Sequence, residues 1–252
     1  MLTYQRKAYY DLVVEAINNN KPNNCFTCVV NDGIDSYASD KDANIVIRNN
    51  DKLGVSKSKN KIVDTLLENG CEHIFIIEDD IIIKDKNVYD KYINAAAETG
   101  IHHLCYEKVD NNGENLTYKK KYNNCELGFY KNPQGAFMYA NAQIYKKVCK
   151  FDEKYLNAFE HIDFEYTLVR NNLAPPFWYF PDLIDSELYI DTIEGCVENS
   201  TITNKENYNS NIQISAHYFI QKWNHFTNQI PQASTDQVEE KLLFLQKHYA
   251  RN

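Results

Sequence analysis

The sequence has no apolar stretch long enough to cross a membrane and no recognisable targeting segment. Apolar runs such as Ile74–Ile77 and Ile81–Ile83 are far short of the roughly 20 residues that a membrane span needs. Arg6 and Lys7 interrupt the N-terminus before the apolar region of a signal peptide can form. The seven cysteines are an odd number without a repeating framework, which favours a reducing compartment. We therefore expect a cytoplasmic protein without a transmembrane segment.

The sequence also has little concentrated positive charge. It carries 27 Lys and Arg against 35 Asp and Glu, a net charge of −8, and its longest basic run is Lys119–Lys121. A nucleic-acid binder needs a basic surface, so we expect no nucleic-acid partner. Cys25 and Cys28 form a CxxC motif without the second pair that a zinc site requires, and we interpret them as small core residues. The 252 residues, 43% of them apolar, predict a single domain of unknown oligomeric state.

Short apolar strands alternate with amphipathic helices through the first half of the chain. The expected strands lie at 25–30, 43–47, 73–77 and 101–106, and the expected helices at 9–17, 55–67 and 87–99. This order predicts an α/β fold with a mostly parallel central sheet flanked by helices. Ligands of such folds bind beyond the carboxyl ends of the strands.

The second half of the chain is less regular. Residues 107–135 are expected to form loops over the site, 141–170 two helices, and 173–213 loops and short strands. Ser234 and Gln237 match a capping box, which predicts a terminal helix after Ser234.

The strongest chemical signal is the run Glu78-Asp79-Asp80 within an Ile-rich stretch. Buried charge is costly unless something compensates it. Hard oxygen ligands after a buried strand suit Mg²⁺ or Mn²⁺, with a substrate phosphate completing the coordination. The alternative is an acidic strand end that faces solvent. Because apolar runs flank the acids on both sides, we favour the metal site.

Eight short motifs occur between Thr3 and Trp223, and their order and spacing along the chain are informative. They are Thr3-Tyr4-Gln5-Arg6, Val29-Val30-Asn31-Asp32-Gly33-Ile34-Asp35, Gly54-Val55-Ser56-Lys57-Ser58-Lys59-Asn60, Glu78-Asp79-Asp80, Gly135-Ala136-Phe137-Met138, Phe151-Asp152-Glu153, Glu160-His161-Ile162-Asp163-Phe164, and His217-Tyr218-Phe219 with Lys222-Trp223. Together they resemble the GT-A nucleotide-sugar glycosyltransferases, most closely glycosyltransferase family 2. In that family the acidic run occupies the place of the DxD metal motif. In the family a full β-strand precedes the Thr3–Arg6 motif, whereas here only Met1 and Leu2 come before it. We therefore expect either a short, degenerate first strand or a chain that is one part of a longer arrangement.

The resemblance implies a GT-A fold with a nucleotide-binding half at 1–106 and an acceptor-binding half, including the C-terminal helix, at 107–252. It implies a UDP-sugar donor, a glycan or other hydroxyl acceptor, and Mn²⁺ or Mg²⁺ as cofactor. The residues implied in donor binding are Thr3, Asp32, Gly33, Lys59, Glu78 and Asp79, and those implied in metal binding are Asp80, Glu78 and His217.

Three of these residues have specific expected roles. Asp32 is expected to accept a hydrogen bond from the uracil N3–H, and Gly33 to let the backbone pass close to the base. Lys59 stands where the family has an Arg, and it would place a point charge near the diphosphate.

The catalytic base is where this chain departs from the family pattern. The family has an Asp after the Glu of its E-D-x-D motif, and here that place is His161, with Asp163 two residues on. An imidazole can act as a general base near neutral pH, oriented by a neighbouring carboxylate. We expect His161 and Asp163 to act as a pair. The alternative is that Glu160 or Asp163 takes the proton and His161 contacts the acceptor.

The function expected from these motifs is a metal-dependent glycosyltransferase, with inversion of the anomeric centre implied by the family likeness. One alternative is a nucleotidyltransferase, which shares strand-end carboxylates but normally has a Gly-rich, basic phosphate loop that this chain lacks near its N-terminus. Another is a non-catalytic nucleotide- or carbohydrate-binding module on the same fold.

Overall fold

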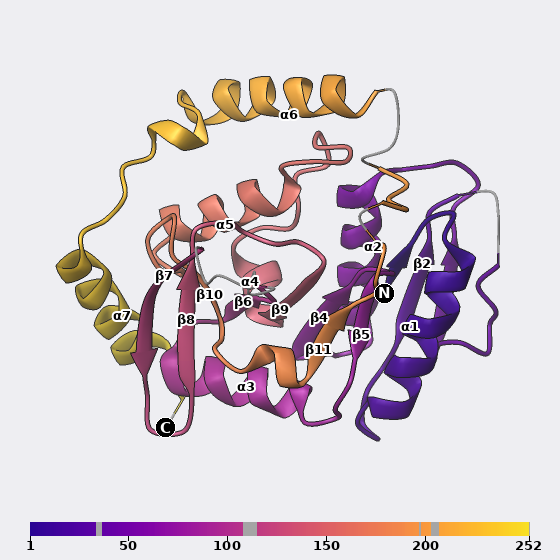
Figure 1. Ribbon diagram of the computed structural model, residues 1–252, viewed down its shortest axis with the longest axis horizontal. Helices are drawn as coiled ribbons and strands as arrows, with labels where there is room; N and C mark the ends of the chain where they lie inside the picture. Colours follow the sequence, from indigo (N-terminus) through magenta and orange to yellow (C-terminus); the bar gives the residue numbers. More distant parts are fainter. Residues whose placement is uncertain (34–36, 108–114, 197, 203–206, 252) are drawn as a thin grey trace.

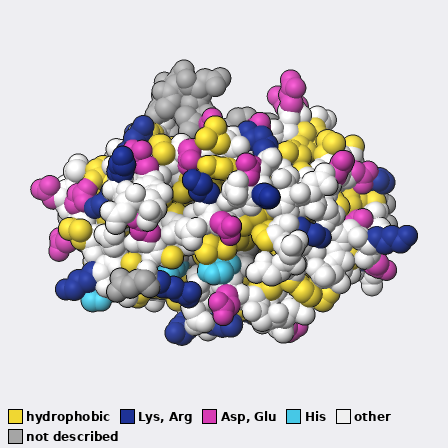
Figure 2. Space-filling view, turned by 90° about the horizontal axis from the view of Figure 1, so that it is seen from below, with side chains coloured by type: hydrophobic (Ala, Val, Ile, Leu, Met, Phe, Trp, Pro, Cys, Tyr) yellow, Lys and Arg dark blue, Asp and Glu magenta, His cyan; other side chains and the backbone are white. Residues whose placement is uncertain are grey.

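The computed structural model describes residues 1–33, 37–107, 115–196, 198–202 and 207–251, which lie around a twisted central sheet (Figure 1). Among the described residues, no helix is both long and apolar enough to span a bilayer. On the face seen in Figure 2, Lys and Arg side chains are interspersed with Asp and Glu and form no broad basic patch.

The N-terminal part is parallel, as predicted. β1 (Leu2–Thr3), β2 (Cys28–Asn31) and β3 (Ile45–Arg48) pair in the order β1-β2-β3, with both pairings parallel. α1 (Lys7–Asn20) connects β1 to β2, and α2 (Val55–Glu68) follows β3. A parallel bridge from Leu2 to Glu78 links β1 to the end of the next strand, so the edge that carries the acids meets the N-terminal sheet.

The central sheet is mixed, and the prediction of a mostly parallel sheet is wrong. β4 (His73–Ile77), β9 (Phe137–Asn141) and β6 (His103–Cys105) lie in the order β4-β9-β6, with β9 antiparallel to both neighbours. Five fully buried residues make β9 a central strand, and it separates β4 from β6. Of the seven strand pairings in the described residues, two are parallel and five antiparallel.

Two further antiparallel sheets are present, and their strands β10 (Phe180–Leu183) and β11 (Ile190–Thr192) fit the short strands expected in 173–213. β7 (Leu116–Lys121) and β8 (Glu126–Tyr130) form a hairpin that pairs with β10 in the order β10-β8-β7. The loop prediction for 107–135 is therefore wrong at these strands, because the buried apolar face of β8 was overlooked; residues 108–114 lie outside the described residues. β5 (Ile81–Ile83) pairs with β11.

Helices cover both faces of the central sheet. Along β4, Ile74 and Ile76 pack in the core with α2, α4 (Ala142–Lys147) and α5 (Glu160–Arg170). Ile77 belongs to the opposite core with α1, α3 (Val88–Thr99) and α7 (Thr235–Tyr249), as strand alternation requires.

The C-terminal half adds the remaining helices. α7 begins at the predicted capping box, since the Ser234 hydroxyl accepts from the Gln237 amide. α6 (Tyr208–Trp223) lies across the top of the molecule in Figure 1, and the short helices η1 (Ser186–Leu188) and η2 (Thr227–Gln229) lie in the connections. The division into halves at residue 106 stays a prediction.

Candidate active site

The three predicted acids form the turn between β4 and β5. The Ile81 amide donates to the Glu78 carbonyl at 3.3 Å and closes the turn. The Ile193 amide, just beyond β11, donates to the Asp80 carbonyl at 2.9 Å. Asp79 is buried, whereas Glu78 and Asp80 are half-buried. The apolar strands on both sides therefore hold the acids at the carboxyl end of β4.

Asp79 is engaged by the segment that follows β1. Its carboxylate accepts from the Thr3 hydroxyl at 2.6 Å, from the Tyr4 amide at 3.2 Å and from the Arg6 guanidinium. Burial raises the pKa of Asp79, and the charge of Arg6 partly offsets that rise. The hydroxyl of Tyr37 lies 2.6 Å from the Thr3 hydroxyl. The predicted donor-binding residues Thr3 and Asp79 are thus brought together, but they bind each other.

Asp80 has one carboxylate oxygen that could bind a cation. Its Oδ2 accepts from Arg6 at 3.3 Å, while its Oδ1 is buried and has no hydrogen-bond partner among the described residues. Burial, and then the charge of Glu78, raise the pKa of Asp80 to about 6, although Arg6 opposes the rise. A buried carboxylate oxygen without a donor is costly. This oxygen therefore fits a divalent cation, which prefers carboxylate ligands.

Lys59 joins the acidic turn to the first turn of α5. Its side chain is 0% exposed, and its Nζ lies 2.9 Å from Glu78 Oε1, 3.1 Å from Glu160 Oε1 and 2.9 Å from the Gly135 carbonyl oxygen. Burial alone would lower the pKa of Lys59, but the two carboxylates outweigh it and hold that pKa above its ordinary value. All three N–H groups have acceptors, so the predicted contact with a diphosphate would require Lys59 to release one.

His161 is the accessible member of the predicted catalytic residues. It is on α5 with its side chain 22% exposed, and its Nδ1 lies 3.3 Å from Glu160 Oε1. Its Nε2 has no hydrogen-bond partner within the described part of the chain. Burial would raise the pKa of Glu160, but Lys59 and His161 hold it well below its usual range. Glu160 is therefore a carboxylate that orients His161.

The local backbone explains how His161 reaches this position. Phe159, at the N-cap of α5, has a φ of 71°, a left-handed conformation that is unfavourable for a residue with a side chain. A Cβ atom on Gly135 would lie 3.1 Å from Cγ of His161 and 3.3 Å from Nζ of Lys59. Glycine at 135 therefore lets the imidazole and the ammonium pack against the backbone.

Asp163 lies apart from His161, and its carboxylate accepts hydrogen bonds from three donors. One carboxylate oxygen accepts from the Tyr155 hydroxyl at 3.1 Å and from the Trp223 indole at 2.7 Å, and the other accepts from Lys222 Nζ at 2.8 Å. The side chain is buried. Asp163 therefore ties the end of α6 to α5, and the structure does not pair it with His161.

Asp32 and Gly33 lie at the end of β2, beside the acidic turn. The Asp32 carboxylate accepts from the Asn49 side chain at 2.9 Å and from the amides of Leu53 and Gly54 at 2.8 and 2.9 Å. A carboxylate has about four acceptor sites, so the donors among the described residues leave one for a ligand. The uracil contact stays a prediction, while the observed bonds position the loop that leads into α2. The matched residues Ile34 and Asp35 lie outside the described residues.

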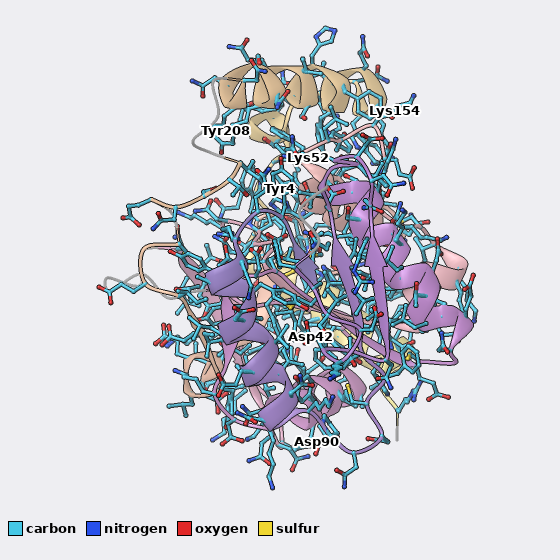
Figure 3. The ribbon with its side chains drawn as sticks, turned by 90° about the vertical axis from the view of Figure 1, so that its right-hand side faces the viewer. Tyr4, Asp42, Lys52, Asp90, Lys154 and Tyr208 are labelled. Carbon is cyan, nitrogen blue, oxygen red and sulfur yellow. The ribbon has the colours of Figure 1, made fainter. Side chains whose placement is uncertain are left out.

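A small pocket lies beside Asp32, Glu78 and Asp79. It has a volume of ≈ 40 Å³. Lys52 Nζ lies 4.2 Å from the centre of the Tyr4 ring at its rim, and the two are seen together below α6 in Figure 3. Its lining includes Thr3, Tyr4, Arg6, Asp32, Lys52, Glu78, Asp79, Thr201 and Ile202. A Cβ on Gly33 would come within 3.0 Å of the Tyr4 ring, so glycine admits this aromatic ring.

A larger cavity lies away from this chemistry. It has a volume of ≈ 430 Å³ and lies by the start of β4, where its lining includes Met1, Cys25, Cys71 and His73. None of the three acids of the turn lines it. The smaller pocket is the candidate active site, because Arg6, Asp32, Glu78 and Asp79 line it.

His217 is not brought to the acidic turn. It is exposed on α6, where its Nε2 lies 3.0 Å from the side-chain nitrogen of Gln221. Within the described residues, no hydrogen bond or ion pair joins it to Asp80 or Glu78. The assignment of His217 as a metal ligand stays a prediction.

Sequence reasoning gave Arg6 and Tyr37 no role. Arg6 contacts both Asp79 and Asp80, and the Tyr37 hydroxyl accepts from the Arg6 amide at 3.2 Å. Arg6 was within a matched motif, so its position after β1 was a usable signal. Tyr37 had none, because it is one of 19 tyrosines.

Comparisons with known proteins identify the fold. No family model matches the sequence, and neither does any curated protein. The mannosyltransferase PcManGT from Pyrobaculum calidifontis, in complex with GDP-Man and Mn²⁺, matches with a TM-score of 0.51 and 10% identity over 96% of this chain and 66% of that chain. GalNAc-T7 with UDP, GalNAc and Mn²⁺ matches with a TM-score of 0.56 and 8% identity over 97% of this chain and 53% of that chain.

This chain thus spans less than two thirds of the length of either structure. At such low identities the likeness shows the fold alone. It confirms the GT-A nucleotide-sugar glycosyltransferase fold that the motifs predicted.

Proposed function

We propose that this chain, which has the GT-A fold, is a metal-dependent glycosyltransferase that transfers a sugar from a nucleoside-diphosphate sugar to a hydroxyl acceptor. The observation that carries the proposal is one connected set of charged groups. It runs from the turn after β4, through Lys59, to Glu160 and His161. The set puts a carboxylate oxygen suited to a cation and an accessible imidazole at the same end of the sheet.

The chemistry of the acidic turn fits a divalent cation, Mn²⁺ or Mg²⁺. Asp80 would hold it through the Oδ1 that has no other partner, with Glu78 as a second ligand. Both neighbouring structures contain Mn²⁺. When bound, such an ion neutralises the charge that develops on a departing nucleoside diphosphate. Arg6 keeps Asp79 and Asp80 in place beside it.

His161 is our candidate for the general base. With its proton on Nδ1, the imidazole donates to Glu160, and its Nε2 is left to accept the proton of the acceptor hydroxyl. Glu160 then stabilises the imidazolium. Direct deprotonation of the acceptor matches a single displacement, which inverts the anomeric configuration. Asp163 is the weaker candidate, because three donors already occupy its carboxylate.

The donor is expected to occupy the pocket beside Thr3, Tyr4 and Asp32. Its ≈ 40 Å³ is far below the roughly 300 Å³ at which ligand pockets begin. Donor binding therefore requires the pocket to widen, and Thr201 and Ile202 are among the residues that line it. A UDP-sugar follows from the motif likeness, whereas one neighbouring structure contains GDP-Man and the other UDP. The acceptor class, a glycan or glycoconjugate, rests on the motifs alone.

A donor panel tests the proposal. Purified protein is incubated with UDP- and GDP-sugars in Mn²⁺ or in EDTA, and release of UDP or GDP is measured together with nucleotide binding by calorimetry. Turnover that requires the metal supports the transferase. Binding of a free glycan without any nucleotide response indicates the non-catalytic module, and release of pyrophosphate from a nucleoside triphosphate indicates a nucleotidyltransferase.

Asp80→Asn identifies the metal site in the same assay. We expect it to abolish the Mn²⁺-dependent part of nucleotide binding. The matched control is Asp90→Asn, which changes an exposed acid in the first turn of α3, at the far end of the molecule (Figure 3). Equal nucleotide affinity and turnover in both variants would show that Asp80 does not bind the metal.

A further inference from the structure

We propose that the interior of this protein holds a second metal site, a structural Zn²⁺ site formed by His103, Cys105 and Glu165. His103 and Cys105 are on β6, and Glu165 is on α5. All three side chains are buried. The site is separate from the acidic turn after β4 and shares no residue with it.

The distances between the three ligand atoms match a tetrahedral site. His103 Nε2 lies 2.9 Å from Glu165 Oε1 and 3.4 Å from Cys105 Sγ, and Sγ lies 3.6 Å from the same carboxylate oxygen. Zinc bonds of about 2.3 Å to sulfur and about 2.0–2.1 Å to nitrogen and oxygen give tetrahedral edges of about 3.5 Å for S–N and S–O and about 3.3 Å for N–O. The observed edges differ from these by about 0.1–0.4 Å. Small rotations of the side chains would therefore complete the geometry.

His103 is oriented as a zinc ligand. Its Nδ1 lies 2.8 Å from the Tyr139 carbonyl oxygen, which can only accept, so Nδ1 carries a proton. In the neutral ring the lone pair is then on Nε2, directed at Cys105 and Glu165. A carbonyl that fixes the tautomer of a histidine is the usual second-shell partner of a zinc site. A thiolate and a carboxylate would offset the two charges of the ion.

Glu107 lies outside the compact group of His103, Cys105 and Glu165, so its carboxylate would have to move towards these atoms to act as the fourth ligand. Residues 103, 105 and 107 are every second residue along an extended segment, so their side chains lie on the same face of the sheet. The Tyr106 amide still pairs with the Phe137 carbonyl at 3.0 Å, which extends the β geometry past the end of β6. Glu107 is buried, and its Oε1 has no hydrogen-bond partner among the described residues. Cys, His and carboxylate ligands around a buried point suit Zn²⁺ better than Mg²⁺ or Ca²⁺.

The metal-free alternative is a buried ion pair between protonated His103 and Glu165, with the Cys105 thiol donating to the same carboxylate. That arrangement satisfies three groups but leaves the Glu107 oxygen without a partner. Zinc content distinguishes the two.

The test measures metal in the whole purified protein. We expect about one Zn²⁺ per chain after dialysis against Mn²⁺ buffer, and a thiolate-to-metal charge-transfer band in the near ultraviolet after replacement by Co²⁺. Cys105→Ala should remove the band and lower the zinc content by at least about tenfold. Cys28→Ala, which removes an equally buried thiol from β2, should keep both, as should Asp80→Asn.

Some results would overturn the proposal. They are wild-type protein without zinc or a charge-transfer band, and zinc that is retained in Cys105→Ala but lost in Asp80→Asn. If Cys105→Ala does not fold, Cys105→Ser replaces it, since serine keeps nearly the same side-chain volume but supplies no thiolate, and the band should again be lost. The result is independent of glycosyl transfer, since none of these readouts uses a donor.

Discussion

Replacing Lys59 by methionine tests the charge arrangement at the centre of the site. The Lys59 ammonium is the only cation that the structure places between Glu78 and Glu160 within the described residues, at 2.9 and 3.1 Å. Methionine retains much of the side-chain volume but leaves Glu78 without its cation and Glu160 with only the His161 imidazole, whose Nδ1 lies 3.3 Å away. Glu78 is 22% exposed and can turn towards water, whereas Glu160 is only 5% exposed. The cost should therefore arise mainly at Glu160.

The expected loss of stability follows from that burial. Removing one partner of a buried ion pair costs about 3–5 kcal/mol, because a charge is left uncompensated. Glu78 is partly solvated and contributes less, so we expect about 3 kcal/mol at pH 7. Lys59→Met combined with Glu160→Gln should restore about 2 kcal/mol, since the unpaired buried charge is then gone.

The stability difference between wild type and Lys59→Met should also depend on pH. In the wild type, the depressed pKa of Glu160 stabilises the folded protein above the unfolded pKa, about 4.3, and this contribution is lost as the pH falls. In Lys59→Met, burial would raise that pKa, so Glu160 takes up a proton and its cost disappears at low pH. The difference between wild type and variant should therefore shrink between pH 7 and pH 4.

Urea unfolding followed by circular dichroism measures these quantities. A variant within about 1 kcal/mol of wild type at pH 7 would refute the reasoning, given the cost expected for an unpaired buried charge. So would strict additivity of the two substitutions, or a stability difference that does not change with pH.

Three further predictions concern neighbouring residues. Because the pKa of Asp80 is raised to about 6, protons compete with the cation there, and calorimetry should show weaker Mn²⁺ binding below about pH 6 than at pH 7.5. Asp163→Asn should weaken the bonds that hold the end of α6 and lower the free energy of unfolding by about 1–3 kcal/mol, measured in urea; no change would show that Trp223 is held by other contacts. Gly135→Ala should displace the imidazole of His161, 3.1 Å from the added Cβ, and lower kcat about tenfold with little change in nucleotide affinity; an unchanged kcat would contradict the close packing.

The acidic turn and its neighbouring strands were predictable because their signals are local. His73–Ile77 is a compact apolar run, and the structure begins and ends β4 at those residues. The order of the strands was not predictable in this way. β9 is antiparallel because it returns from the β7–β8 hairpin to insert between β4 and β6, a pairing that local patterns do not encode.

The same distinction between local patterns and long-range contacts applies to the roles of the site residues. Glu160, His161 and Asp163 are neighbours in sequence, so the motif left their roles open. Contacts with Lys59 and Trp223, 101 and 60 residues away, separate them. Glu160 pairs with the lysine and Asp163 with the tryptophan, which leaves the imidazole accessible. Such long-range contacts are outside what one sequence reveals.

The rate of sugar transfer by His161→Ala is the most direct test of the proposed mechanism. It is measured at saturating donor and Mn²⁺, with nucleotide affinity determined on the same preparation and His248→Ala, an exposed histidine on α7, as the control. We predict a rate about 10²–10⁴-fold lower for His161→Ala, with nucleotide affinity and His248→Ala unchanged. Transfer by His161→Ala at the wild-type rate would contradict the assignment of His161 as the base.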